Sequence, residues 1–114
     1  MPQLRRKKMK GRSRRSEALA LLGLAQRAGA VVKGTDATRN ALRKGVAQLV
    51  ILATDGSKTQ QEKVLPLALA RGVTWIRLGS MDELGGALGA GPLAAVAVTG
   101  SRLAGEIRKR SGRD

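Results

Sequence analysis

The sequence predicts an α/β fold, a compact three-layer α/β/α sandwich built around four short strands. Helical and strand patterns alternate along the chain, which places helices on both faces of a central sheet. The run 48–53 is almost entirely apolar, as expected of a central strand covered on both faces. With 114 residues, the chain is long enough for one domain with a modest core. Because Trp75 is the only aromatic residue, that core must consist of Leu, Val, Ile and Ala.

The first predicted helix begins at Ser13 or Ser16 and runs to about Ala28, where Gly29 can stop it. Apolar residues cover most of its surface, so we expect the helix to be well buried. These residues are Leu19, Leu21, Leu22, Leu24 and Ala25. A short strand is expected to follow at Ala30–Lys33.

The next helix, expected over Thr35–Lys44, is the most informative element. The Thr35 hydroxyl can cap its start, and Gly45 can end it. Ala41 and Leu42 are expected to face inward. Three cations are then expected to face solvent: Arg39, Arg43 and Lys44. The helix start would combine free backbone N–H groups, a positive dipole end and flanking cations, which together suit the phosphate backbone of RNA or DNA.

The central strand at 48–53 leads into a turn at 54–56 and then into another helix. The start of that helix, Ser57–Gln60, matches a capping box. Pro66 should kink the helix or mark a late start, and we expect the helix to end near Gly72.

The remaining elements complete the alternation. Thr74–Leu78 is predicted as a strand that suits an edge of the sheet. A short helix capped by Ser80 follows, with Asp82 and Glu83 in its first turn, where acids favour the helix dipole. Leu93–Val98 is the last predicted strand, and Ser101–Lys109 a final helix with a frayed basic end.

The formal net charge of +14 is unevenly placed along the chain. Residues 1–15 carry eight cations and no acid, and we interpret them as a basic, disordered arm. Such an arm gains order and affinity on nucleic acid by displacing counterions, although a simple solubilising tail is the alternative. Residues 16–105 are then expected to form the nucleic-acid-binding domain, and 106–114 a basic C-terminal tail.

Composition excludes several classes of function. A single aromatic residue rules out modules that stack bases on aromatic platforms. Without Cys or His, the usual zinc sites, disulfides, thiol nucleophiles and histidine acid–base chemistry are excluded, so we expect neither enzyme activity nor a cofactor or metal. No apolar run reaches membrane-spanning length and no secretory signal is recognisable, which makes a cytoplasmic protein without a membrane partner the expectation. The high charge favours a monomer.

Two further features allow more than one interpretation. Asp55 ends the central strand, where ligands often bind in α/β folds, but a turn-forming Asp before Gly56 is the favoured interpretation. The glycine-rich run 86–91 lacks the spacing of a phosphate-binding loop. We expect the glycines to let the backbone of this loop approach a partner closely. The loop would then form a small apolar lip at the same end of the sheet as Thr35. The lip would consist of Ala90, Pro92 and Leu93.

Taken together, five segments resemble the kink-turn-binding ribosomal protein superfamily, often called the L-seven-A-e type, and most of all its bacterial branch. They are 21–29 (LLGLAQRAG), 34–45, 49–55, 82–85 and 94–98. The resemblance implies an α/β/α sandwich with a small mixed four-stranded sheet. It also implies a non-enzymatic RNA-binding protein of ribosomal type that recognises kink-turns, which are sharply bent stem–internal-loop–stem elements with tandem sheared G·A pairs.

The resemblance also assigns site residues. The family's Gly-Thr-Asn-Glu-x-x-Lys motif, which reads the G·A pairs, falls on 34–40 of this chain. Gly34 and Thr35 match, whereas the Asn, Glu and Lys positions hold Asp36, Ala37 and Asn40. The apolar loop that packs against a flipped-out base falls on 90–93, and Asp55 lies where the family often has an acid near the RNA. The expected RNA-binding set is Lys33, Gly34, Thr35, Asp36, Ala37, Arg39, Asn40, Arg43, Lys44, Asp55, Ala90, Gly91, Pro92 and Leu93.

The three departures from the motif change what the site can read. Asp36 accepts hydrogen bonds but cannot donate them as Asn does, Ala37 removes an acceptor and Asn40 removes a cation. Lys33, Arg39 and Arg43 could restore charge but not the same hydrogen bonds. Since phosphate contacts position whereas base contacts specify, we expect kink-turns to be read weakly or differently, with the arm supplying affinity.

Two other functions stay open on the sequence. One is a protein-interaction module on the same fold, which the altered motif allows. The other is an accessory RNA-recognition subunit of a modifying enzyme, whose activity would require a partner subunit. Net charge and the basic arm favour RNA, with kink-turn or ribosomal RNA as the expected partner.

Overall fold

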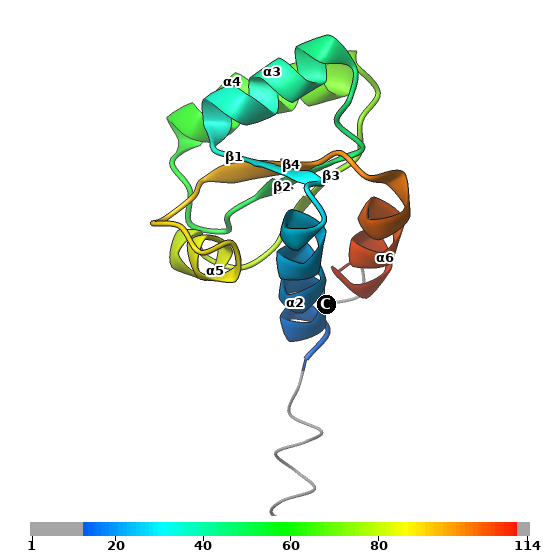
Figure 1. Cartoon of the computed structure of the whole chain (residues 1–114). Coiled ribbons are helices and arrows are strands. Elements are labelled where there is room, and N and C mark those ends of the chain that lie inside the picture. The colour runs from blue at the N-terminus through cyan, green and yellow to red at the C-terminus, as the bar shows by residue number, and fades with distance from the viewer. Residues whose placement is uncertain (1–12, 112–114) are drawn as a thin grey trace, which may run out of the picture.

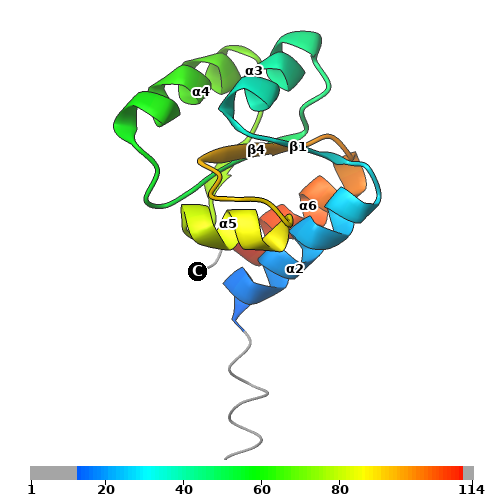
Figure 2. The same ribbon diagram turned by 60° about the vertical axis from the view of Figure 1, so that its left-hand side comes forward.

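A computed structural model describes residues 13–111 of the chain. The expectations for residues 1–12 of the basic arm and for 112–114 lie outside the described residues. A four-stranded sheet of order β1-β4-β2-β3 lies between two layers of helices, with α3 and α4 on one face and α2, α5 and α6 on the other (Figures 1 and 2). The predicted α/β/α sandwich is confirmed.

The sheet is mixed, as the family resemblance implied. Strand β4 (Ala95–Val98) runs antiparallel to both β1 (Val31–Lys33) and β2 (Leu49–Leu52), and β3 (Trp75–Arg77) is parallel to β2. The two central strands, β2 and β4, are buried at every position, which explains why 49–53 is an unbroken apolar run. Strand β3 lies at an edge, as predicted.

The core has one half on each face of the sheet, because alternate residues of a strand point to opposite faces. From β2, Leu49 and Ile51 pack with α2, α5 and α6, whereas Val50 and Leu52 pack with α3 and α4. Aliphatic side chains and alanines fill both halves, as the composition required.

Helix α2 (Arg14–Arg27) begins at Ser13, whose hydroxyl accepts a hydrogen bond from the Ser16 N–H (3.0 Å). The expectation that this helix is covered on most sides is wrong. Only Ala18, Leu22 and Ala25 are buried, and Leu24 is 46% exposed. The helix covers one face of the sheet, so its outer side faces solvent.

The globular unit extends beyond both boundaries expected from the sequence. Arg14 and Arg15, placed in the arm by their charge, form the first turn of α2. Helix α6 (Ser101–Ser111) continues past residue 105, and its Ile107 is fully buried in the core. Arg110 joins α6 to α2 through Glu17 (3.8 Å) and pairs with Glu106 (2.8 Å) in its own helix.

On the other face, α3 (Thr35–Lys44) packs against α4 (Lys58–Ala70). Ser57 caps α4 by accepting from the Gln60 N–H (3.1 Å), which confirms the serine half of the predicted capping box. The other half is not formed, because the Gln60 side chain accepts from Thr35 instead. Helix α4 starts well ahead of Pro66 and continues beyond it, so the late start that Pro66 could have marked is not found. The helix ends at the Arg71 C-cap, next to Gly72, close to the predicted end.

Candidate nucleic-acid interface

The starts of three helices meet at one end of the sheet. Strands β1, β2 and β3 all finish at this end, because β1 and β2 both run antiparallel to β4 and β3 is parallel to β2. Helices α3, α4 and α5 (Met81–Ala87) therefore begin here, and the loop 88–94 leads from α5 into β4 at the same place. We call this the helix-start end; it lies at the left of Figure 1.

Helix α3 is capped by Gly34, so the prediction that Thr35 is its cap is wrong. The Gly34 N–H donates to the Ala95 carbonyl of β4 (2.9 Å), which holds this residue to the sheet. The chain turns from strand to helix there with φ 101° and ψ 160°, a conformation that is essentially restricted to glycine. Thr35 is already helical, and its hydroxyl donates to Gln60 Oε1 in α4 (2.6 Å).

A glycine cap leaves the first turn of α3 with free donors. The first N–H groups of a helix have no intrahelical acceptor, and Gly34 supplies no side-chain oxygen to replace one. The N–H groups of 35–37 therefore point out of the helix at its positive dipole end. This is an arrangement that binds phosphate or other anionic and acceptor groups.

We predict that replacing Thr35 with valine lowers the free energy of unfolding by about 0.5–1.5 kcal/mol, because the hydrogen bond to Gln60 is lost at nearly constant volume. Thr35→Ser keeps the hydroxyl donor and should retain more of the stability. Urea unfolding of both variants checks this. A Thr35→Val protein as stable as the wild type, with a loss confined to Thr35→Ser, would show that the methyl group, and not the hydroxyl, is responsible.

The loop 88–94 is fixed against α5 by backbone contacts. The Ala90 N–H donates to the Gly85 carbonyl (2.8 Å), and the Leu93 N–H donates to the Met81 carbonyl (3.1 Å). The Gly91 backbone lies so close to Gly85 that a Cβ atom added to Gly85 would overlap the Gly91 carbonyl group. The loop presents an exposed Gly91 and Pro92, whereas Ala90 and Leu93 are half-buried and Leu93 packs against the core. The apolar lip lies at the same end of the sheet as Thr35, as predicted.

Asp55 lies in the turn before Gly56, as the favoured interpretation has it, but its side chain bonds the start of α5 and not the turn itself. Its Oδ1 accepts from the Met81 N–H (2.8 Å) at the start of α5. The Thr54 hydroxyl and N–H both donate to the Gly79 carbonyl, at 3.2 and 2.8 Å. The turn at 54–56 is therefore tied to the start of α5.

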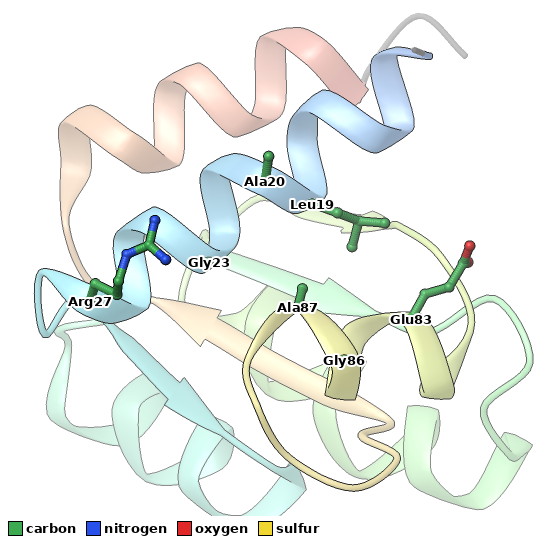
Figure 3. A pocket seen from close by; sticks show the side chains of 7 residues that line it. All are labelled: Leu19, Ala20, Gly23, Arg27, Glu83, Gly86 and Ala87. Carbon is green, nitrogen blue, oxygen red and sulfur yellow. The ribbon is translucent and has the colours of Figure 1, made fainter. Parts of the chain in front are cut away.

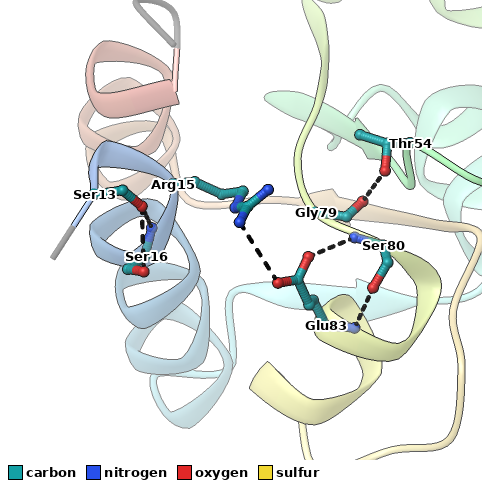
Figure 4. Close-up of polar contacts among 7 residues, drawn as sticks. All are labelled: Ser13, Arg15, Ser16, Thr54, Gly79, Ser80 and Glu83. Carbon is teal, nitrogen blue, oxygen red and sulfur yellow. Dashed lines mark hydrogen bonds and ion pairs between the residues drawn. The ribbon is translucent and has the colours of Figure 1, made fainter. Parts of the chain in front are cut away.

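The start of α5 is closed by a capping box that the sequence analysis did not identify. The Ser80 hydroxyl accepts from the Glu83 N–H (3.0 Å), and Glu83 Oε1 accepts from the Ser80 N–H (2.8 Å) (Figure 4). Arg15 of α2 lies 4.0 Å from the other oxygen of Glu83. The Ser-x-x-Glu spacing was the available signal.

The cations expected at the site are not gathered in one place. Lys33 is exposed at the end of β1, beside the start of α3. Arg43 and Lys44 are exposed in the last turn of α3, about 13 Å along the helix from Thr35 at 1.5 Å per residue. They lie at the opposite end of the sheet. Arg39, which we expected in solvent, lies in the middle of α3 and is partly buried. Its Nε has no hydrogen-bond partner among the described residues.

The other expected site residues of α3 are Asp36, Ala37 and Asn40. Asp36 is exposed in the first turn. Asn40 is also exposed, and its Oδ1 accepts from Arg43 (3.4 Å). Ala37, Asn40 and Lys44 border a hollow of about 240 Å³ over β1. Sequence reasoning missed Thr38, which is fully buried with Ala41 and Leu42 and completes their helical spacing.

A second hollow, of about 470 Å³, lies between α2 and α5 and contains none of the predicted site residues (Figure 3). Arg27 and Glu83 border it, and small residues of the two helices line much of the rest.

No helix within 13–111 has the length and apolar character needed to cross a bilayer.

Comparison with known proteins places these features in a family. Residues 16–105 match the profile described as "Ribosomal protein L7Ae/L30e/S12e/Gadd45 family". The chain is 37% identical over 93 residues to "Large ribosomal subunit protein eL8" of Halobacterium salinarum, which covers 79% of this chain and 78% of that protein. It is 34% identical over 91 residues to "RNA-binding protein YlxQ" of Bacillus subtilis, covering 80% and 91%. The match to eL8 of Haloquadratum walsbyi, 39% identical over 74 residues, spans 64% of this chain and 62% of that protein.

Two solved structures share the fold. A protein with unknown function from Bacillus halodurans superposes with a TM-score of 0.80 at 25% identity, over 84% of this chain and 97% of that one. The Giardia lamblia 15.5kD RNA binding protein superposes with a TM-score of 0.67 at 26% identity, over 82% and 83%.

Proposed function

The chain belongs to the ribosomal protein L7Ae/L30e/S12e/Gadd45 family, and on this premise we propose that it is a non-enzymatic RNA-binding protein that recognises structured RNA of the kink-turn type. The observation that carries the proposal is the helix-start end, where the first turn of α3, which has no side-chain cap, lies beside a loop held against α5. Relatives named as a ribosomal protein and as an RNA-binding protein support the same class of partner.

Each part of this end has a role in the proposed complex. The N–H groups of 35–37 offer donors to acceptor groups of the RNA, and Gly34 has no side chain to obstruct its approach. Gly91 and Pro92 present an exposed, uncharged surface on which an unstacked base can rest. Thr35 is positioned by Gln60, so the turn that carries the donors is held against α4.

The substitutions within the motif set the expected strength of recognition. Asp36 is exposed beside the donors and adds a negative charge where phosphates would approach. Ala37 has no group that can hydrogen-bond a base edge. We therefore propose that backbone donors and shape position the RNA, with fewer base-edge hydrogen bonds than the family motif provides.

Charge outside this end completes the proposal. Residues 1–15 carry eight cations and no acid, so they are proposed to add phosphate contacts. We further propose that the protein acts as a monomer in the cytoplasm, in association with ribosomal or other structured RNA.

A direct test compares binding to a standard kink-turn RNA with binding to a duplex of equal length, across a salt series. We expect the kink-turn to bind at least about tenfold more tightly near physiological salt, equivalent to about 1.4 kcal/mol. Equal affinity for both RNAs with a steep salt dependence would contradict kink-turn recognition and indicate a general electrostatic RNA binder. Binding to neither RNA would favour a protein-interaction module.

A further inference from the structure

The end of the sheet opposite the candidate interface carries positive charge alone. We call it the far end; α2, α3 and α4 finish there and α6 begins there, at the right of Figure 1. The connections 24–31, 41–49, 67–75 and 98–104 contain five exposed cations and no carboxylate. None of the five forms an ion pair with another described residue. They are Arg27, Arg43, Lys44, Arg71 and Arg102.

The helix-start end has a different balance. From the last residue of β1, β2 and β3 through the first turn of the helix that follows each, it contains three cations and four carboxylates. The cations are Lys33, Lys58 and Arg77, and the carboxylates are Asp36, Asp55, Asp82 and Glu83. The molecule is thus polarised along the sheet. The surface that matches the family's RNA site is the less positive of the two.

Helix dipoles account for part of this polarity. Cations are favoured at helix C-termini and acids at N-termini, which suits Arg27, Lys44 and Arg71. Arg102 does not follow the rule. It lies in the first turn of α6, at the positive dipole end, and that turn has no acid to balance it. A cation in that position opposes its own helix, and an anion supplied from outside would relieve the repulsion.

We propose that the far end is a second nucleic-acid surface, which binds the phosphate backbone of a helical RNA segment. The inference goes beyond the proposed function: one molecule could hold a structured RNA at the helix-start end and a second RNA segment at the far end. The partner is assigned from the spread of the charge. The five cations come from both helical layers of the sandwich, which suits a broad, regular polyanion. Such contacts carry no base specificity and need no aromatic residue.

The test uses the full chain and two charge-matched double variants. Arg71→Gln with Arg102→Gln removes one far-end cation from each helical layer. Lys63→Gln with Lys109→Gln is the control. It removes the same charge from exposed positions inside α4 and α6, away from both ends of the sheet. Binding of each to a perfect RNA duplex is measured across a salt series. We expect the far-end variant to bind at least about tenfold more weakly at about 0.1 M salt, with a log–log slope shallower by about two.

The control variant should show less than half of these changes, and Arg71→Lys with Arg102→Lys should keep the wild-type slope. Equal effects of the two glutamine variants would overturn the proposal. So would an unchanged duplex affinity combined with weaker binding of polyglutamate, which would assign the face to an acidic protein partner. Capture of a labelled duplex by protein held on immobilised kink-turn RNA tests bridging separately. A protein that fails to bind the kink-turn but shows the duplex effect would contradict the proposed function and leave the second surface standing.

Discussion

Replacing Gly85 with alanine is expected to lower the free energy of unfolding by about 1–3 kcal/mol, the usual cost of forcing an extra methyl group into a packed site. The added Cβ would overlap the carbonyl group of Gly91 and lie 2.8 Å from the Ala90 carbonyl oxygen. Both are backbone groups, so no side-chain rotation can make room. The loop 88–94 would have to move off α5 and break the hydrogen bond from the Ala90 N–H to the Gly85 carbonyl.

The displaced loop is the one proposed to contact RNA, so Gly85→Ala should also weaken kink-turn binding. Gly86→Ala is the matched control: it lies next in the same helix, and its Cβ would have nothing within 4 Å. Since alanine favours a helix over glycine, this control should be neutral or more stable by up to about 1 kcal/mol. Urea unfolding and RNA titration of both variants give the result. Indistinguishable behaviour of the two would show that the contact with Gly91 is unimportant.

Local patterns predicted most of the fold correctly. The apolar run at 48–53 contains the central strand β2, in which both faces are covered, so that every side chain of the strand is buried. Ser13, Ser57 and Ser80 each cap a helix, since a side-chain oxygen three residues ahead of an N–H forms that bond in almost any context. These features depend on neighbours along the chain.

Failures occurred where the outcome depends on contacts between distant segments. Threonine and glycine are about equally favoured as caps, so local preference cannot choose between Thr35 and Gly34, and the hydrogen bond from Gly34 to Ala95 holds Gly34 at the cap position. Ala95 is 61 positions away (95 − 34), and no local pattern could have indicated the contact. Leu24 is exposed for a similar reason, because only the packing of α2 on the sheet decides which side of the helix is covered.

The division of charge between the two ends of the sheet required the strand directions. The sequence grouped Arg43 and Lys44 with Thr35, because they belong to the same helix. Their association with Arg102 follows only once β4 is known to run antiparallel to β2, which brings the end of α3 and the start of α6 to one end. Periodicity predicts strands without their order, so the far end could not have been predicted.

Replacing Gly34 with alanine is expected to cost about 1–3 kcal/mol of stability through backbone strain alone. A Cβ at this position would meet nothing within 4 Å, so steric contact with other residues contributes nothing. The cost arises because φ 101° with ψ 160° is disfavoured for every L-residue with a side chain. The variant has two ways to respond: it can keep the conformation and lose stability, or it can shift the start of α3 and misplace the N–H donors of 35–37.

Measuring stability and RNA binding together separates these two responses. Full kink-turn affinity with reduced stability would mean that the geometry is kept under strain, whereas loss of both would mean that the helix start has moved. Gly105→Ala, inside α6 with no positive φ and nothing within 4 Å, is the control and should be more stable by up to about 1 kcal/mol. A Gly34→Ala protein with wild-type stability and wild-type affinity would contradict the role given to this residue. The site would then have to be sought away from the first turn of α3.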